Sequence, residues 1–161
     1  MYVFFTRLIS FSLFVVLCST SLYAEDGIVK VRIREIHGLG IANKANGDVS
    51  ISEELRDLDK KLKKLNYQEY QLLDTQMQEV VLKQRANLSF SDGHVLTVRP
   101  LYLTPAGEAS RISMWIHWAD KLGMEILDTR MHFTCGEAML TGVEQTNKDG
   151  RILAIDVTPV K

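Results

Sequence analysis

The chain has 161 residues, of which 46% are hydrophobic and 24% are charged. Its 19 basic and 20 acidic residues give a formal net charge of −1. The sequence therefore lacks the basic excess that is typical of nucleic-acid-binding proteins, and we expect no nucleic-acid partner.

The first 24 residues have the layout of a secretory signal peptide. A single basic residue, Arg7, precedes an apolar run over 8–18, and a small and polar stretch follows as far as Ala24. The apolar run is shorter than the roughly 18 residues that a membrane-spanning helix needs. We predict cleavage after Ala24, a periplasmic or secreted protein, and no transmembrane helix in the mature chain, residues 25–161.

Cleavage would leave a chain of 137 residues, which is the length of one domain. It would also remove Cys18, which follows the bulky Leu17 and so does not fit the pattern of a lipid-modified cysteine. Cys135 would then be the single cysteine, and no internal disulfide would form. We therefore predict one β-rich domain over 25–161 that is stabilised by its hydrophobic core.

The mature chain is expected to begin with a strand. In IVKVRIREI, residues 28–36, apolar and basic residues alternate with the period of a strand that is buried on one face. The next stretch, HGLGIANKANGD at 37–48, is rich in glycine and asparagine and predicts a loop with a short extended piece around Ile41.

An amphipathic helix is expected over about 51–65. Ser50 and Glu53 have the spacing of a capping box, in which each side chain bonds to a backbone amide of the first turn. Leucines step along one face by three, four and three positions: Leu55, Leu58, Leu62 and Leu65. Acidic residues precede the lysines over 60–64, which matches the helix dipole and favours a solvated helix end over a patch for anionic lipid or nucleic acid.

From Tyr67 onward the apolar period is two, which predicts a run of strands. They are expected at 68–74, 79–90, 94–104, 111–120, 123–135, 137–145 and 151–159, with turns at TPAGEA (104–109), DKLG (120–123) and the Asp-Gly sites SDGH (91–94) and NKDG (147–150). Pro100 predicts an edge or a bulge. The fold class is therefore mainly β, an antiparallel β-sandwich or partly open barrel with an N-terminal strand and one helix.

The stretch SMWIHWAD, residues 113–120, is a candidate site because it places two tryptophans around a histidine. In a strand, alternate side chains point to opposite faces. The core face is then expected to hold Ile112, Met114, Ile116 and Trp118, and the opposite face Ser113, Trp115, His117 and Ala119. In the next strand the same alternation points Leu127, Thr129, Met131, Phe133 and Cys135 inward and Ile126, Asp128, Arg130 and His132 outward.

The outward-facing residues of these two strands allow two interpretations. Trp115, His117, Arg130 and His132 form a candidate partner-binding face, because exposed tryptophan and arginine are enriched where proteins bind one another. The other interpretation is that the helix or the first strand covers this face and makes Trp115 part of the core.

A chemical site is the rival interpretation of the same segment. His117 and His132 are expected on one face of neighbouring strands, but Cys135 joins them only through a bulge, and a zinc site needs three or four converging ligands. The sequence has no G-x-S-x-G elbow, phosphate-binding loop or cysteine-protease signature. We therefore assign no catalytic residue, no metal ligand and no cofactor.

The segments VRIREI, LRDLDKKLKKLNYQEYQLLD, GHVLTVRP, ISMWIHW and GRILAI together resemble a loose group of uncharacterised exported bacterial proteins. In that group a first strand and a Leu/Lys-rich helix precede a small β domain. The resemblance implies a bacterial source and an envelope location, and it brings no functional residue with it.

The expected function is an exported, non-catalytic binding or scaffold module for a protein partner in the cell envelope. The alternative is a metal-binding protein or hydrolase that uses His117, His132 and possibly Cys135. The sequence favours a non-catalytic protein over an enzyme and leaves the oligomeric state open.

Overall fold

The computed structural model describes residues 27–41, 49–104, 110–144 and 149–160. The predicted signal peptide lies outside these residues, as do most of the predicted turn at 104–109 and the first half of the one at 147–150. The strands of the described residues are β1 (Ile28–Ile41), β2 (Ser50–Ile51), β3 (Tyr67–Val81), β4 (Ala86–Ser89), β5 (Val95–Thr104), β6 (Arg111–Ala119), β7 (Glu125–Thr134), β8 (Met139–Glu144) and β9 (Gly150–Val160).

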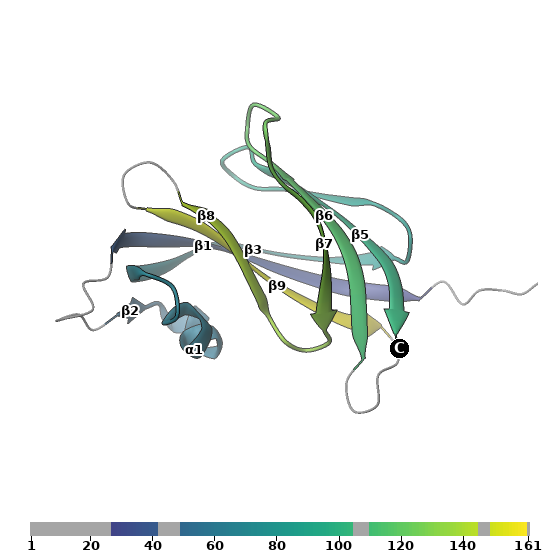
Figure 1. Ribbon diagram of the computed structural model, residues 1–161, viewed down its shortest axis with the longest axis horizontal. Coiled ribbons are helices and arrows are strands. Elements are labelled where there is room, and N and C mark those ends of the chain that lie inside the picture. The colour runs from purple at the N-terminus through teal and green to yellow at the C-terminus, as the bar shows by residue number, and fades with distance from the viewer. Residues whose placement is uncertain (1–26, 42–48, 105–109, 145–148, 161) are drawn as a thin grey trace, which may run out of the picture.

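These strands form two sheets that pack face to face (Figure 1). Sheet A has the order β2-β3-β1-β9-β8 and sheet B the order β4-β5-β6-β7. Every pairing is antiparallel except that of β2 with β3. The predicted class, a mainly β antiparallel sandwich with one helix, is confirmed, and the described residues do not close into a barrel.

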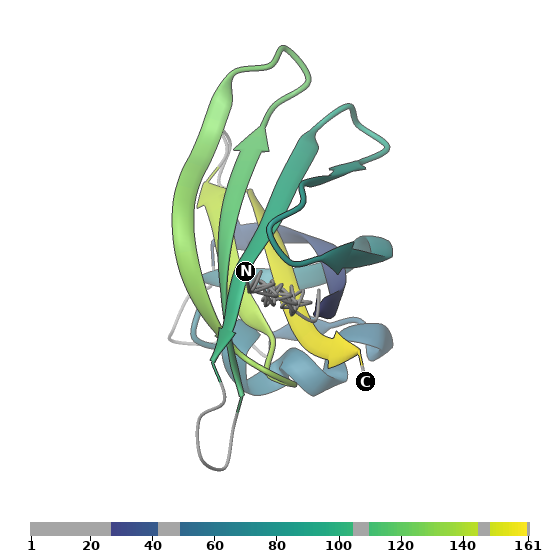
Figure 2. The same ribbon diagram turned by 90° about the vertical axis from the view of Figure 1, so that its right-hand side faces the viewer.

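The main hydrophobic core lies between the two sheets (Figure 2). Sheet A contributes alternate residues of β1 and β9, among them Val31, Ile33 and Ile155. Sheet B contributes the predicted inward residues of β6, each 0% exposed: Ile112, Met114, Ile116 and Trp118. In β7, Phe133 is buried while Asp128, Arg130 and His132 are exposed, as predicted. The outward prediction is wrong for Ile126, which packs against the core between the sheets, and the predicted outward residues Ser113 and Ala119 of β6 are buried, Ala119 beside a register shift.

The helical segment is shorter than predicted and is not a single helix. A 3₁₀ helix, η1 (Glu53–Leu58), runs into one turn of α-helix, α1 (Asp59–Leu62). The capping box is wrong, because Ser50 belongs to β2 and the residue at the N-cap is Ser52, which makes no side-chain capping bond. Pairing with β3 replaces the cap, since the Ser52 amide donates to the carbonyl oxygen of Tyr70 at 3.1 Å.

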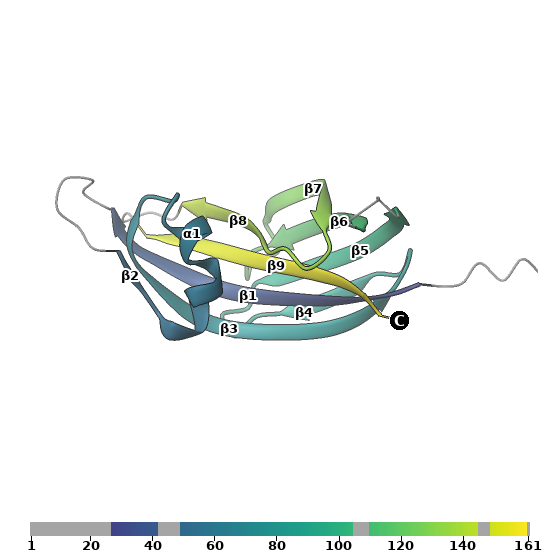
Figure 3. The ribbon, with the colours of Figure 1, turned by 90° about the horizontal axis from the view of Figure 1, so that it is seen from below.

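The three leucines of this segment are buried as their spacing predicts, but they cover the face of sheet A that points away from sheet B. Leu55, Leu58 and Leu62 pack there on Ile36, Tyr70, Ala138, Ile152 and Ala154. Figures 1 and 3 show the helix at one end of sheet A and sheet B at the other. The interpretation in which the helix covers Trp115 is therefore wrong.

Two of the predicted boundaries are also wrong. β1 continues to Ile41 instead of ending at 36, because it is the central strand, and its residues His37 and Gly38 pair with both β3 and β9. Tertiary pairing overrides the local glycine signal here. The strands expected at 68–74 and 79–90 are arranged differently, as β3 runs without a break through Asp74 to Val81 and the break falls between Leu82 and Arg85.

The turns predicted at 91–94 and 120–123 and the proline prediction are confirmed. At 91–94 the Phe90 amide donates to the His94 carbonyl oxygen at 2.9 Å, which closes the hairpin between β4 and β5. At 120–123 Gly123 has a φ of 78°, a conformation that glycine adopts without strain. The register of β5 against β6 shifts between Pro100 and Tyr102, as expected of a bulge at a proline.

No helix within the described ranges combines the length and the apolar character needed to cross a bilayer.

Candidate functional site

The side chains of sheet B that point away from sheet A form a continuous surface, which we call the outer face. We define it by Arg99, Tyr102, Ser113, Trp115, His117, Glu125, Asp128, Arg130 and His132 of the strands, together with Arg85, which directly precedes β4 and lies over Trp115. All four residues predicted for partner binding lie on it, and Trp115 is partly exposed at its middle, in β6.

Trp115 is held in place from several sides. Across the sheet it pairs with Arg99 in β5 and Arg130 in β7. Its ring stacks on that of His117 with a centroid separation of 5.8 Å and an interplanar angle of 16°, and its Nε1 donates to Asp128 Oδ1 at 2.5 Å. The guanidinium of Arg85 lies 5.2 Å from the ring centroid, which is cation–π distance. These contacts fix the indole before any ligand arrives.

Arg130 is fixed in a similar way on the neighbouring strand. Its guanidinium lies 5.0 Å from the ring centroid of Tyr102, and its Nε donates to Ser113 Oγ at 2.8 Å. The bulge between Pro100 and Tyr102 places Tyr102 directly across from Ser113. Tyr102 is 43% exposed, so this aromatic–arginine pair is part of the surface.

The outer face has an excess of positive charge that the described residues do not neutralise. None of Arg85, Arg99 and Arg130 forms an ion pair within the described part of the chain, and Arg99 Nε donates to the backbone oxygen of Lys83. The acidic groups present are Asp128, which accepts from Trp115, and Glu125, 3.8 Å from His117 Nε2. Such a surface attracts carboxylates, because arginine forms two parallel hydrogen bonds with them.

The two histidines share the outer face but do not meet. His117 pairs across the sheet with Asp128, and His132 pairs with Ser113. Ser113 precedes His117 by four residues in β6, so the histidines are separated by roughly 13 Å along the strand direction. They lie on one face of neighbouring strands, as expected, but the register of β6 and β7 keeps them apart.

Cys135 lies apart from both histidines. It packs with the core between the sheets, its amide donates to the carbonyl oxygen of Ser110 at 2.9 Å, and burial raises the pKa of its thiol. Within the described residues, no group of three or more His, Cys, Asp and Glu side chains is arranged to hold a metal ion. The described residues therefore provide no three-ligand group for the metal-site alternative.

Sequence reasoning missed several residues that shape the site. Asp128 was placed on the outward face, but its bond to Trp115 depends on the strand register. Tyr102 had a usable signal, since the apolar phase of the strand changes at Pro100, where the bulge occurs. Arg85 had none, because it lies in the break between β3 and β4, where a continuous strand was expected.

A second group of titratable side chains joins the two sheets at the turn between β4 and β5. Arg151 Nε lies 3.1 Å from Glu35 Oε1, Arg151 also pairs with Asp92, and Asp92 Oδ2 lies 3.5 Å from His94 Nε2. Burial raises the pKa of Glu35, and burial together with Arg151 lowers the pKa of His94. Burial opposes ionisation of Asp92 too, but its bonds from the His94 amide and Arg151 lower its pKa. These groups mainly pair with one another, which favours a structural role.

No protein-family model matches this chain, and no match to it was found among curated proteins or among solved structures. The resemblance to exported bacterial proteins therefore stays an expectation, and any function must be argued from the outer face itself.

Proposed function

We propose that this protein is an exported, non-catalytic binding module that recognises an acidic surface of a partner protein in the cell envelope. The contact surface is the outer face of sheet B, with Trp115 at its centre and His117, Arg130 and His132 beside it. Export follows from the signal-peptide pattern of residues 1–24, and the mature protein is periplasmic or secreted.

One observation carries the proposal. The outer face presents a tryptophan surrounded by arginines that lack carboxylate partners among the described residues, and the helix that was expected to cover it lies elsewhere. Tryptophan and arginine are the residue types that contribute most energy at protein interfaces. Because the side chains are already ordered by stacking and hydrogen bonds, binding loses little of their conformational freedom.

The surface also has the chemistry of recognition without that of catalysis. Its polar groups are occupied by one another: Trp115 bonds to Asp128, and Arg130 to Ser113. A partner that supplies carboxylates to the free edges of Arg85, Arg99 and Arg130 gains charge-assisted hydrogen bonds without breaking these internal contacts.

Photo-crosslinking in the native cells tests the proposal. A benzoylphenylalanine placed at the exposed His132 should crosslink to a specific protein, whereas the same group at the exposed Thr158 in β9 should not. Once identified, that protein should bind the purified Arg130→Glu and Trp115→Ala variants at least tenfold more weakly than the wild type. Lys30→Glu, a matched charge reversal in β1, should bind as the wild type does.

A melt of each variant separates lost binding from lost folding. Arg130→Glu is the more informative variant, because Arg130 is exposed and its removal leaves the core intact. If Arg130→Glu stays folded and binds the crosslinked protein normally, or if Thr158 crosslinks while His132 does not, the outer face is not the contact surface.

A further inference from the structure

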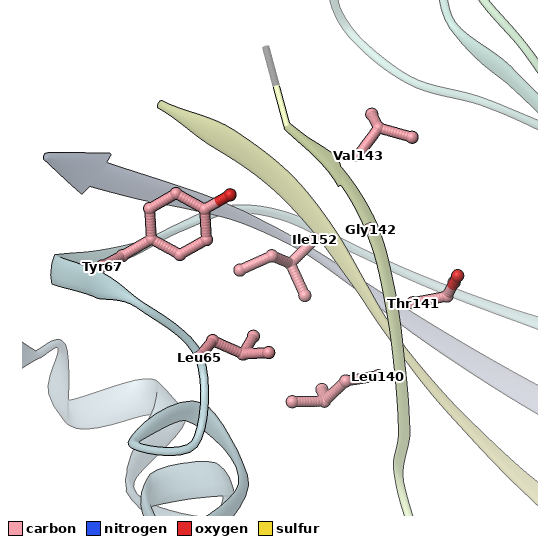
Figure 4. Close-up of a pocket in the computed structure, with 7 residues that line it drawn as sticks. All are labelled: Leu65, Tyr67, Leu140, Thr141, Gly142, Val143 and Ile152. Carbon is pink, nitrogen blue, oxygen red and sulfur yellow. The ribbon is translucent and has the colours of Figure 1, made fainter. Parts of the chain in front are cut away.

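A groove runs between the turn that follows α1 and the strand β8, on the face of sheet A that is remote from sheet B (Figure 4). We call it the helix–β8 groove and define it by Lys61, Lys64, Leu65, Tyr67, Leu140 and Ile152. Three adjoining hollows of about 140, 330 and 360 Å³ share Leu65 and together make up the groove.

The floor of the groove is apolar and its end wall is fixed. Figure 4 shows Leu65 and Leu140 pointing toward one another beside Ile152. The ring of Tyr67 lies over Gly38 and Gly150, which pair across β1 and β9, and a Cβ at either glycine would overlap the ring. The two glycines therefore allow Tyr67 to lie flat on the sheet and close one end of the groove.

Beside the groove, β8 is an edge strand of sheet A. Within the described residues β8 pairs with β9 alone, so it is the last strand of sheet A. Figure 4 shows Thr141 and Val143 pointing away from the groove, so these two residues line it with backbone. An edge strand keeps a row of unpaired N–H and C=O groups that accept a further strand.

The rim of the groove carries a net positive charge. Lys64 has no ion-pair partner among the described residues, and Lys61 Nζ donates to the backbone oxygen of Ala138. Lys63, in contrast, pairs with Asp59 at 2.9 Å. Among the described residues, Glu137 is the single acidic residue that lines these hollows, so the charge favours an acidic occupant.

We propose that the helix–β8 groove binds an extended acidic segment of a partner protein. The segment adds as a strand to the free edge of β8, places an apolar side chain against Leu65 and Leu140, and directs carboxylates to Lys61 and Lys64. When a peptide adds as a strand, backbone hydrogen bonds give the affinity and pockets for alternate side chains give the specificity. The edge of β8 offers the backbone groups, and the apolar hollow offers the pocket. The site is separate from the outer face of sheet B and does not depend on the function proposed for it.

The probe is a displayed library of random dodecapeptides, selected on the immobilised purified protein. Enriched peptides should alternate apolar and acidic residues, and synthetic labelled copies should bind in a fluorescence-anisotropy titration. The double variant Lys61→Glu/Lys64→Glu should weaken this binding at least tenfold. Lys121→Glu, a charge reversal in the turn between β6 and β7, should leave it unchanged, as should Trp115→Ala if the two surfaces are independent.

Hydrogen exchange with and without the bound peptide tests the strand addition itself. Alternate amides of β8 should become protected, while those of β6 and β7 keep their rates. Enriched peptides without acidic residues, unchanged exchange in β8, or equal loss of binding in Lys121→Glu would each overturn the proposal. Sodium laurate serves as a further probe, with the NMR signals of Leu65 and Leu140 as the readout. If laurate shifts these signals and no peptide binds, the groove is a lipid site instead.

Discussion

Arg34 of β1 and Asp57 of η1 form a two-bonded ion pair that ties the helix to the centre of sheet A. The Nη1–Oδ1 and Nη2–Oδ2 distances are 2.7 and 2.8 Å, and Arg34 Nη2 also lies 3.4 Å from Asp156 Oδ2. The side chain of Arg34 is 6% exposed, whereas that of Asp57 is 54% exposed. The hydrogen bonds from Arg34 lower the pKa of Asp57, so the pair stabilises the fold while Asp57 is ionised.

Asp57→Asn should lower the free energy of unfolding by about 1–2 kcal/mol at neutral pH, because it leaves the buried Arg34 with a weaker partner. Since the folded pKa of Asp57 is depressed, its contribution is present above the unfolded pKa of about 3.9 and is lost as the pH falls through the folded value. Urea unfolding at pH 7 and pH 3 should therefore show a smaller difference between wild type and variant at pH 3.

Asp59→Asn is the matched control for that measurement. Asp59 pairs with Lys63 at 2.9 Å on the helix surface, where such a pair contributes about 0.3–0.5 kcal/mol. If the two asparagine variants were equally stable at neutral pH, Arg34 would not anchor the helix.

Leu58→Asp and Leu62→Asp should each lower the free energy of unfolding by about 2–5 kcal/mol, because each forces a charge into the contact between helix and sheet A. Leu58 is 2% exposed and Leu62 is fully buried. The control is Lys60→Ala, an exposed neighbour that should change stability by less than about 0.5 kcal/mol. Lys61 is unsuitable as a control, because its Nζ donates to the Ala138 oxygen.

Denaturant melts of these three variants decide whether the helix is docked. A result in which all three behave alike would show that the leucines do not contact the sheet, and it would remove one wall of the helix–β8 groove.

His94 should make the protein less stable as the pH falls below about 6.5. Burial and Arg151 lower its pKa in the folded state, so the unfolded chain binds the proton more readily. This contribution is complete above the unfolded pKa and is lost as the pH falls through the folded pKa. Chemical denaturation between pH 7.5 and pH 5 should show a smaller loss of stability in His94→Gln than in the wild type.

His132→Gln serves as the comparison for His94, since His132 is exposed on the outer face. It should keep the wild-type dependence on pH. If the free energy of unfolding changed equally with pH in the wild type and His94→Gln, His94 would not control stability in this range. Another titratable group near it, such as Glu35 or Asp92, would do so.

Replacing His117 and His132 together with glutamine should leave metal content and folding unchanged. The register separates the two histidines by roughly 13 Å. Within the described residues, no group of three or more His, Cys, Asp and Glu side chains is arranged to hold a metal ion. Elemental analysis of the purified wild type and double variant is the measurement. Stoichiometric zinc or copper that disappears in the double variant would favour the metal-binding alternative and count against the proposed binding module.

The exported protein should begin at Glu25. The basic residue, apolar run and Ala24 of the N-terminal segment predict removal of residues 1–24. Intact mass spectrometry of material from the cell envelope should give the mass of residues 25–161. A mass that includes residues 1–24, or recovery in the cytoplasm alone, would contradict export.

The sequence by itself determined the secondary-structure class and which side chains of β6 and β7 point to the core. Alternation in 111–119 and 125–134 assigned Trp118 and Phe133 to the core and Trp115, Arg130 and His132 to the outside, because side-chain direction in a strand follows from position alone. The Asp-Gly turn at 92–93 and the bulge at Pro100 were also predictable, since both depend on the local conformational limits of these residues.

Strand lengths and the extent of the helix were decided by tertiary contacts. β1 continues through His37 and Gly38 because it lies between β3 and β9, and pairing on both sides outweighs the low strand propensity of glycine. The predicted helix over 51–65 is reduced to η1 and α1 because Ile51 pairs with Tyr70, and the Tyr70 hydroxyl donates to the oxygen of Leu62 at 2.8 Å.

Which neighbours surround the candidate residues was decided by tertiary structure. Leucine spacing showed that the helix buries an apolar face, but it carries no information on which sheet face receives it, and this choice leaves Trp115 uncovered. Register set the distance between His117 and His132, and the bulge brought Tyr102 to Arg130. Periodicity fixes the direction of a side chain within its own strand, whereas its neighbours depend on how strands far apart in the sequence align.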